Sequence, residues 1–488
     1  MLIRKPTFLI SILTCLTTCN QPTTESNTAS AEQRKTPNIL ILLADDLGYG
    51  DLSCYGHSVI QTPNLDQLAS EGVRLTDCYS AAPVCSPSRA GLLTGRMPNR
   101  LGIYDWIPEG SPMHIHEGET TIAQLFQQHG YATGQFGKWH CNGKFNSAEQ
   151  PQAGDLGFEY WFGTQNNASP SHHNPANFVR NGTPVGEIEG FSSHIVADEA
   201  INWLEEQADQ DKPFFAYVAF HEPHEPVASP PKLVSDYADA AINEDQAQYF
   251  ANVTNMDRAV GKLLQTLDDL HLAENTLVIF TSDNGPETLN RYEKASRSYG
   301  SPGTLRGMKL YVYEGGMRVP GIMRWPGHIE PGQVSSQPIS SLDFFPTFSA
   351  MLGQEMPTDR TYDGTDISTF FNNQPVERER PLLWVYPTAL GGPTVGMRAG
   401  DWKLLGYTKH RYLPKGNTRG ILIGNETMNA LKHDSLDHYE LYSIQQNPSE
   451  WQDVGRADSP LLDSLQQLMQ KYYYQLQKDS PVMDLEAN

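Results

Sequence analysis

The sequence predicts an α/β fold in which a mostly parallel sheet is covered by helices on both faces. Several apolar or aromatic runs of six or seven residues have the composition of strands that are buried on both faces. Segments with a helical pattern alternate with these runs, and such alternation is typical of a covered sheet. With 488 residues and 39% hydrophobic content, the chain is long enough for one large and one small domain.

Four buried strands are expected in order along the chain, with helices between them. The strands lie at residues 38–44, 131–136, 214–220 and 276–281. The helices lie at residues 120–129, 195–210 and 246–272. We find no internal repeat, so this alternation predicts a single sheet.

The pattern changes near residue 380. Shorter strand-like runs follow at residues 394–398, 401–406 and 439–442, and an amphipathic helix is expected from residue 460 to about 477. We therefore expect a main domain at residues 37–380 and a smaller C-terminal subdomain at residues 381–488.

Each of the four buried runs is followed directly by polar residues. These are Asp45 and Asp46, Lys138 and His140, His221, and Asp283 and Asn284. Each cluster taken alone is also a good turn or capping sequence. Ligands of open α/β sheets bind at the carboxyl ends of the strands, however, so one shared site accounts for all four clusters.

Four of these residues offer only oxygen ligands. Asp45, Asp46 and Asp283 supply carboxylates and Asn284 supplies an amide oxygen. Such a set suits a hard divalent cation, Ca²⁺ or Mg²⁺, better than Zn²⁺. No cysteine or histidine spacing of the zinc type competes with this interpretation.

A further motif lies at the start of an expected helix. Residues 85–89 read Cys-Ser-Pro-Ser-Arg, and Ala-Gly-Leu-Leu-Thr-Gly-Arg follows at residues 90–96. This run resembles the Cys-x-Pro-x-Arg signature of the sulfatase family. In that family the cysteine is oxidised after translation to formylglycine (3-oxoalanine), an aldehyde whose hydrate is the nucleophile. The resemblance therefore implies that Cys85 is not the chemical group that reacts.

Three other motifs extend the resemblance over nearly the whole mature chain. Residues 137–140 are similar to the family's Gly-Lys-Trp-His, and residues 221–224 match its His-x-Pro-His. Lys309 lies shortly before a Glu-Gly-Gly-x-Arg-Val-Pro run that begins at Glu314, as in sulfatases. The chain departs from the family pattern at Cys141, where leucine commonly follows the histidine.

The resemblance assigns roles to individual residues. The implied metal is Ca²⁺, while the ligand types alone also allow Mg²⁺, and the implied metal shell consists of Asp45, Asp46, modified Cys85, Asp283 and Asn284. The implied catalytic residues are Cys85, Arg89, Lys138, His140, His221 and Lys309. The implied fold is alkaline phosphatase-like: a large mixed, mostly parallel sheet sandwiched by helices, with a small C-terminal antiparallel sheet and a helix.

The implied reaction is the hydrolysis of a sulfate ester through a covalent sulfo-enzyme intermediate. The cation, Lys138 and Lys309 would neutralise the sulfuryl oxygens while the aldehyde hydrate attacks sulfur. His221 or Lys309 would protonate the leaving alcohol. His140 would then take a proton from the second hydroxyl of the hydrate, and sulfate would be expelled.

The net charge of −22 and the lack of any run rich in lysine and arginine exclude a typical nucleic-acid-binding protein. An acidic chain is also an unusual partner for an anionic ester. An acidic chain can bind an anionic ester only if the few basic residues named above concentrate positive potential around the cation.

The amino terminus predicts export. A basic start and an apolar run at residues 8–16 are typical of a signal peptide at residues 1–18. Cys19 ends a run that resembles a lipobox, so we expect lipidation there rather than cleavage near residue 31, with residues 19–36 as a flexible tether. The expected location is the periplasm or cell surface. Beyond Cys85, three cysteines (54, 78 and 141) allow at most one disulfide in the body of the chain.

One polar loop, at residues 166–180, is expected to contribute to substrate specificity. It contains His172, His173 and Arg180, which we expect to contact a sugar, although a plain surface loop explains the same residues. An exported sulfatase suits sulfated polysaccharides of algae, such as ulvan, carrageenan or fucoidan, or glycosaminoglycan oligosaccharides. Its maturation would need a formylglycine-generating or anaerobic sulfatase-maturating enzyme.

Two other functions stay open from the sequence. The first is the activity of another enzyme of the same superfamily, either an aryl sulfatase or a phosphonate or phosphodiester hydrolase. A non-catalytic lipoprotein that binds sulfated glycans is the other alternative, although such a protein has no need of the full set of motif residues.

Overall fold

A large mixed sheet carries the carboxyl-edge residues predicted above. The computed structural model describes Leu2, Gln210 and residues 36–208, 212–288, 299–412, 425–455 and 459–482. The predicted signal peptide, Cys19 and most of the tether lie outside these residues. Met1–Thr36 and Pro37–Asn488 are separate units, and the fold below is that of the second unit.

The described residues form an eleven-stranded sheet in the order β10-β2-β9-β8-β1-β7-β3-β4-β5-β6, with β11 paired to β2. Five neighbouring strands are parallel: β8 (Thr276–Ser282), β1 (Asn38–Ala44), β7 (Phe214–Ala219), β3 (Ala132–Lys138) and β4 (Tyr160–Thr164). β9 (Arg318–Arg324) is antiparallel to β8 and to β2 (Val73–Tyr79). The short edge strands are β5 (Val179–Arg180), β6 (Thr183–Pro184), β10 (Gln333–Ser335) and β11 (Ile339–Ser340). The predicted mixed, mostly parallel sheet is confirmed.

One predicted strand was too short at its carboxyl end. The second of the four predicted strands was expected to end at residue 136, but β3 continues to Lys138 because Gly137 and Lys138 pair with Gly163 and Thr164 of β4. Lys138 therefore lies at the end of a strand rather than after it. Its position is fixed by its pairing with β4.

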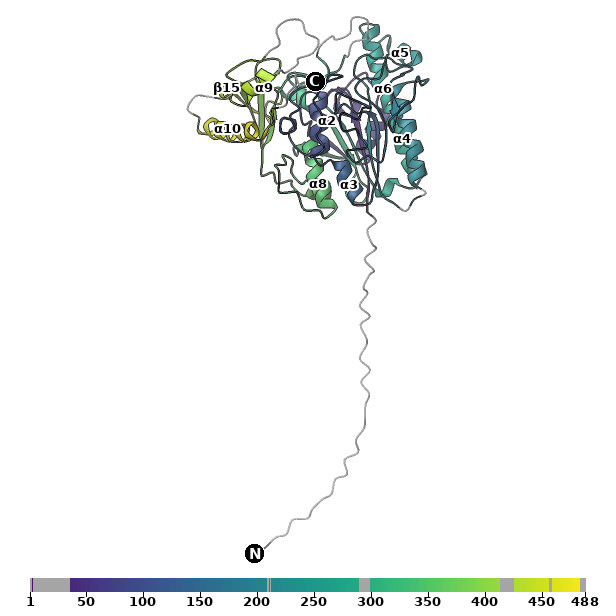
Figure 1. Ribbon diagram of the computed structural model, residues 1–488, viewed down its shortest axis with the longest axis horizontal. Helices are drawn as coiled ribbons and strands as arrows, with labels where there is room; N and C mark the ends of the chain where they lie inside the picture. Colours follow the sequence, from purple (N-terminus) through teal and green to yellow (C-terminus); the bar gives the residue numbers. More distant parts are fainter. Residues whose placement is uncertain are drawn as a thin grey trace. The chain divides into compact units, whose positions relative to one another are not determined.

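Helices cover both faces of this sheet (Figure 1). One face carries α1 (Pro63–Ser70), α4 (Ser192–Ala208), α5 (Pro231–Tyr237) and α6 (Glu244–Asp269). The other carries α2 (Cys85–Thr94), α3 (Ile122–Gln128) and α8 (Phe344–Met351). Alternate residues of β1 enter the two cores, Ile39, Ile41 and Leu43 on one side and Leu40 and Leu42 on the other. Since side chains alternate along a strand, an all-apolar strand is explained by two covered faces.

A second, antiparallel sheet follows residue 380. It contains β12 (Leu382–Val385), β13 (Val395–Ala399), β14 (Trp402–Thr408) and β15 (Leu436–Ser443). The predicted small C-terminal sheet and final helix are confirmed. α9 (Asn425–Leu431) precedes β15, and α10 (Pro460–Asp479) packs its apolar stripe on the sheet.

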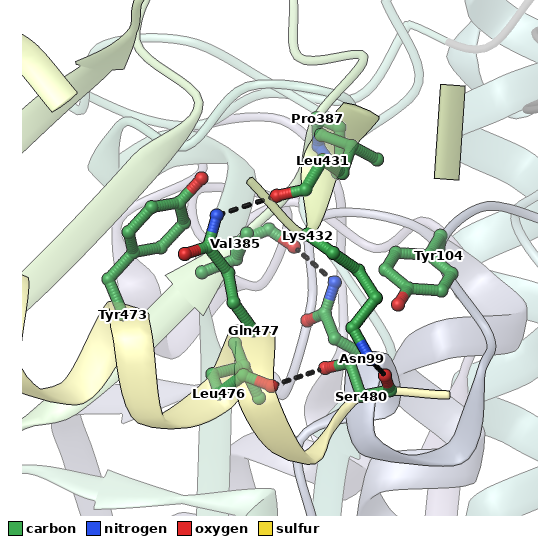
Figure 2. Close-up of a pocket in the computed structure, with 10 residues that line it drawn as sticks. All are labelled: Asn99, Tyr104, Val385, Pro387, Leu431, Lys432, Tyr473, Leu476, Gln477 and Ser480. Carbon is green, nitrogen blue, oxygen red and sulfur yellow. Dashed lines mark hydrogen bonds between the residues drawn. The ribbon is translucent and has the colours of Figure 1, made fainter. Parts of the chain in front are cut away.

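The end of α10 is tied to neighbouring loops by side-chain hydrogen bonds (Figure 2). Gln477 donates to the carbonyl oxygen of Leu431 at 2.6 Å, and Lys432 donates to that of Ser480 at 2.6 Å. The cavity between them holds only about 20 Å³, which is room for about one water molecule. It is a packing gap and not a ligand site. Among the described helices, none is both long and apolar enough to cross a membrane.

A buried group of charged side chains joins the two sheets. We call it the inter-sheet cluster: Asp77, Tyr79, Glu314, Arg318, Arg398, Lys403 and Glu450. Glu314 in α7 (Glu314–Met317) receives hydrogen bonds from Arg318 at 2.7 Å and from Lys403 at 2.6 Å. Arg398 lies 2.6 Å from Asp77. The Glu-Gly-Gly-x-Arg-Val-Pro run therefore forms α7 and the start of β9, with Arg318 in a structural contact.

Candidate active site

The carboxyl ends of the neighbouring strands β1 and β8 bring two pairs of oxygen-bearing side chains together. Ala44 pairs with Ser282, so Asp45 and Asp46 emerge beside Asp283 and Asn284. Asp46 has φ of 63°, a left-handed conformation that aspartate tolerates better than most residues. Its N–H donates to Asp283 Oδ1 at 3.1 Å. The tight turn therefore holds both pairs at one point of the sheet edge.

Helix α2 brings Cys85 to this point. The helix starts at Cys85 after an extended Val84, and all of its residues are buried. Cys85 Sγ lies 3.8 Å from Asp46 Oδ1. Burial raises the pKa of the Cys85 thiol far above its usual value, and the positive charges of Lys138 and Lys309 only partly oppose this rise. The unmodified thiol therefore stays protonated and is a poor nucleophile.

Three basic side chains contact the three aspartates, and Arg89 Nη2 also lies 3.5 Å from Asp45 Oδ1. Lys138 Nζ lies 2.6 Å from Asp45 Oδ2. Lys309 Nζ lies 2.8 and 2.7 Å from the two oxygens of Asp46. The Arg89 guanidinium lies 2.8 Å from Asp283 Oδ2 through both Nε and Nη2. The predicted basic residues are thus all present in one buried cluster.

The ion pairs of the site, counted over the described residues, join four carboxylates to three basic side chains. The fourth carboxylate is Glu287, 3.3 Å from Lys309. Burial alone would raise the pKa of Asp45, but the positive charges around it, Lys138 first, hold that pKa well below its usual value. Burial raises the pKa of Asp283 to about 7 despite Arg89. The cluster has a surplus of negative charge, which one divalent cation would turn into a positive one.

Two oxygens of the site favour a bound cation. Asp45 Oδ1 and Asn284 Oδ1 are buried and have no hydrogen-bond partner among the described residues. An unmatched buried oxygen is costly unless a cation or water satisfies it. Ligand atoms of Asp45, Asp46, Cys85 and His224 all lie within 4.8 Å of one another. This donor set fits a metal site.

The compact group shares Asp45, Asp46 and Cys85 with the predicted metal shell and adds His224. Asp283 uses one oxygen for the N–H of Asp46 and the other for Arg89, and it is not part of the compact group. His224 is part of it, with Nε2 3.5 Å from Asp46 Oδ2. The sequence did not include His224 among the site residues, although it is the second histidine of the His-x-Pro-His motif. The motif therefore contained the information needed to predict His224 as a site residue, but the prediction did not use it.

His140 and His221 each keep one ring nitrogen without a hydrogen-bond partner in the described part of the chain. His140 Nε2 lies 3.0 Å from the carbonyl oxygen of Ile107, and His221 Nε2 lies 2.8 Å from the hydroxyl of Thr164. A carbonyl only accepts, and the Thr164 hydroxyl already donates to the carbonyl of Asn166. Both Nε2 atoms are therefore donors, and both Nδ1 atoms carry lone pairs. Burial lowers both pKa values well below the usual range, so both rings are neutral at pH 7.

The predicted sugar-contact residues are not brought together. His172 is buried behind the His221 loop, where Asn252 of α6 donates to its Nδ1 at 3.1 Å. Arg180 on β5 points instead to Glu199 of α4, with Nε 2.5 Å from Oε1. His173 is exposed and stacks near Phe191. Their role in sugar binding stays a prediction.

The first part of the same loop lines a cavity of about 840 Å³. The cavity lies beside the catalytic cluster, because the carbonyl oxygen of Gln165, a lining residue, accepts from the N–H of His140 at 2.7 Å. Its lining residues are Trp106, Glu109, Gly110, Gly143, Lys144, Phe145, Ser147, Glu149, Gln165, Asn166, Asn167, Ala168, Ser169, Pro170, Asn177 and Pro226. The sequence predicted residues 166–170 and Asn177 as part of a binding loop, but not the two segments at 106–110 and 143–149.

Comparison with known proteins agrees with this geometry. Residues 37–354 match the sulfatase family, and residues 308–412 match the family described as N-sulphoglucosamine sulphohydrolase, C-terminal. Human arylsulfatase A is 34% identical over 91% of this chain and 89% of its own length. Human N-acetylgalactosamine-6-sulfatase is 36% identical over 75% of this chain and 72% of its own length.

A solved structure extends the likeness to three dimensions. The crystal structure of Ps i-CgsB in complex with k-i-k-neocarrahexaose has a TM-score of 0.77 and 27% identity, and the match covers 93% of this chain and 95% of that chain. The fold, the cysteine-led helix and the matched length agree with one another. The chain belongs to the sulfatase family and is a sulfuric ester hydrolase.

Proposed function

We propose that this sulfatase removes sulfate from sulfated carbohydrates, with formylglycine derived from Cys85 as its reactive group and Ca²⁺ as its metal. The observation that carries this proposal is the convergence of Cys85 with three basic side chains and the unpartnered oxygens of Asp45 and Asn284. The carbohydrate class is supported by the polar cavity beside the site. It is also supported by the saccharide held by the structural relative described above.

Bound Ca²⁺ would be held by Asp45, Asp46 and Asn284, and it would supply charge neutralisation at the sulfuryl oxygens. Lys138 and Lys309 stand beside the same carboxylates and would bind the remaining oxygens of the sulfate group. Arg89 is held by Asp283 and would fix the polar end of the modified side chain at position 85. Formylglycine supplies a hydrated aldehyde as the nucleophile.

Proton transfer is assigned to the two neutral histidines and Lys309. The lone pair on His140 Nδ1 can accept a proton at the step that releases sulfate. The leaving alcohol needs a proton, and Lys309 is placed to give it; His221 can give one only after its Nδ1 has taken up a proton, because its Nε2–H is held by Thr164. Because Nε2 of each histidine is held by a fixed oxygen, each ring presents Nδ1 in one orientation.

The modification is tested by mass spectrometry of the peptide that contains Cys85, from protein made together with a formylglycine-generating enzyme. We expect a loss of about 18 Da, the exchange of sulfur for oxygen with two hydrogens removed. Sulfate release is then measured on aryl sulfates and on sulfated saccharides. An unmodified thiol in protein from the native cell would contradict the mechanism and favour the glycan-binding alternative. Faster turnover of phosphate diesters than of any sulfate ester would favour the hydrolase alternative.

The proposal extends to the location of the enzyme. The basic and apolar start of the chain and Cys19 support export and lipidation. Replacement of Cys19 by serine is expected to move the protein from the membrane fraction to the soluble fraction of the cell envelope. A protein that stays in the cytoplasm would contradict the export proposal.

A further inference from the structure

The cavity beside the catalytic cluster differs from that cluster in charge and lining. Apart from backbone and small side chains, it offers amides (Gln165, Asn166, Asn167 and Asn177) and the aromatic rings of Trp106 and Phe145. Amides and aromatic faces are the groups that bind hydroxyls and the apolar faces of sugar rings. The catalytic cluster, in contrast, is lined almost entirely by charged groups.

The charged groups of the cavity favour a neutral ligand. Among the described residues that line it, only Lys144, Glu109 and Glu149 are charged. Lys144 Nζ lies 2.5 Å from Glu149 Oε2, so its charge is already matched. Glu109 adds an uncompensated carboxylate. A second sulfate or a uronic acid in this cavity would meet a net negative charge, and like charges at short distance repel.

The shape of the cavity is fixed before any ligand binds. Gln150 Oε1 accepts from the N–H groups of Gly143 and Lys144 at 2.9 and 2.8 Å, while its Nε2 donates to the carbonyl oxygen of Ser111 at 2.8 Å. This amide therefore ties the segment that carries Lys144 to the segment that carries Glu109. Asn177 in turn donates to the carbonyl oxygen of Asn167 at 2.8 Å. A preformed cavity keeps its charges in place and can discriminate between ligands.

We propose that this cavity binds an uncharged sugar unit next to the sulfated one, and that Glu109 makes the enzyme reject substrates with a second anionic group at that position. The proposal rests on the proposed function and narrows its substrate class. The enzyme acts best on saccharides in which a sulfated unit is joined to a neutral or N-acetylated unit.

The test uses pairs of disaccharides with the full-length, formylglycine-containing enzyme. Each pair carries one sulfate at the same position of a galactose-type ring, and the pairs cover every ring hydroxyl. One member is joined to unsulfated galactose and the other to glucuronic acid. We expect kcat/KM to favour the neutral member at least threefold, and we expect Glu109→Lys to shift this ratio by about tenfold toward the anionic member. Added salt should shrink the preference, because it screens the charges.

Glu205→Lys is the matched control. Glu205 is exposed on α4, outside the cavity lining, so the same charge reversal there should change the ratio by less than about twofold. Thermal unfolding of both variants checks that they fold. An unchanged ratio in Glu109→Lys would overturn the inference, and so would release of sulfate from an aryl sulfate but from no disaccharide. Failure to release sulfate from any ester, aryl sulfate included, would instead contradict the proposed function.

Discussion

The catalytic cluster and the inter-sheet cluster are both buried groups of paired charges, yet they differ in how completely the protein satisfies them. Glu314 receives Arg318 and Tyr79 on one oxygen and Lys403 on the other. Within the described residues of the inter-sheet cluster, the side-chain atom without a hydrogen bond is Glu450 Oε1, which lies 3.8 Å from Lys403. In the catalytic cluster, two oxygens lack a hydrogen bond, Asp45 Oδ1, which lies 3.5 Å from Arg89 Nη2, and Asn284 Oδ1, and both lie beside a buried thiol and neutral histidines.

This difference shows why buried charge does not by itself mark a functional site. Shifted pKa values occur in both clusters: burial raises the pKa of Glu450 to about 8, and burial raises that of Asp283 to about 7. Structural ion pairs also shift pKa values. What distinguishes the catalytic cluster is the set of oxygens that the protein leaves unmatched. The four predictions below test this distinction, in order of decreasing effect.

The largest effect is expected from Cys85→Ala. The variant removes the group that is converted to formylglycine, so sulfate release should fall by about 10⁴-fold or more. Stability should change little, by about 1 kcal/mol, because only a small side chain is truncated. Cys78→Ala is the control, since Cys78 is also buried but lies in β2, with Sγ 3.7 Å from Thr281 Oγ1. Loss of activity in both variants would show that Cys85 has only a structural role.

The inter-sheet cluster should behave in the opposite way. Lys403→Met leaves Glu314 and Glu450 buried with less compensation, and the free energy of unfolding should fall by about 3–5 kcal/mol. Activity per folded molecule should stay within about twofold. Lys262→Met is the control: its pair with Asp198 spans 2.9 Å but is exposed, so the loss should be about 1 kcal/mol or less. Urea unfolding measures both. A large fall in kcat for Lys403→Met at full folding would contradict the comparison.

The unmatched oxygens should be satisfied by a cation. Calcium at about 100 times its Kd should stabilise the protein by about 2.7 kcal/mol, through binding to the folded state only. A chelator should remove both this gain and sulfate release. Asp46→Asn should abolish the calcium-dependent rise in Tm, whereas Asp198→Asn, at the exposed pair, should retain it. A rise that is equal in all three proteins would mean that calcium binds elsewhere.

The strand ends could be predicted because the apolar run and the polar residues that follow it are adjacent in the sequence. An apolar run that stops at Asp45 or at Asp283 is visible in the sequence, and parallel pairing then places such ends together. The boundary of β3 was missed because Gly137 and Lys138 are not typical strand residues. Their strand conformation comes from pairing with β4, which the sequence of β3 does not contain.

The environment of the histidines could not be predicted for a similar reason. His172 and His173 are adjacent in a polar loop, yet one is buried and the other exposed, because Asn252, 80 residues later, hydrogen-bonds to His172. His224 joins the metal group only through the path of the loop after β7. Such contacts depend on tertiary packing, and residue type alone does not encode them.

The smallest expected effect is a pH dependence of the free energy of unfolding, which should differ between the neutral histidines of the catalytic cluster and solvent-exposed histidines. Burial, with Lys138 and Arg89 nearby, lowers the pKa of His140 well below the unfolded value of 6.5, so the unfolded chain binds a proton that the folded chain does not. This contribution to stability is present above pH 6.5 and is lost as the pH falls below it. Between pH 7.5 and 5.5, wild type should lose about 1.4 kcal/mol more than His140→Gln, measured by urea unfolding at fixed calcium. The same replacement of His438, which is exposed on β15, is the matched control. An equal pH slope in wild type and His140→Gln would mean that His140 is protonated in the folded protein and is no free base.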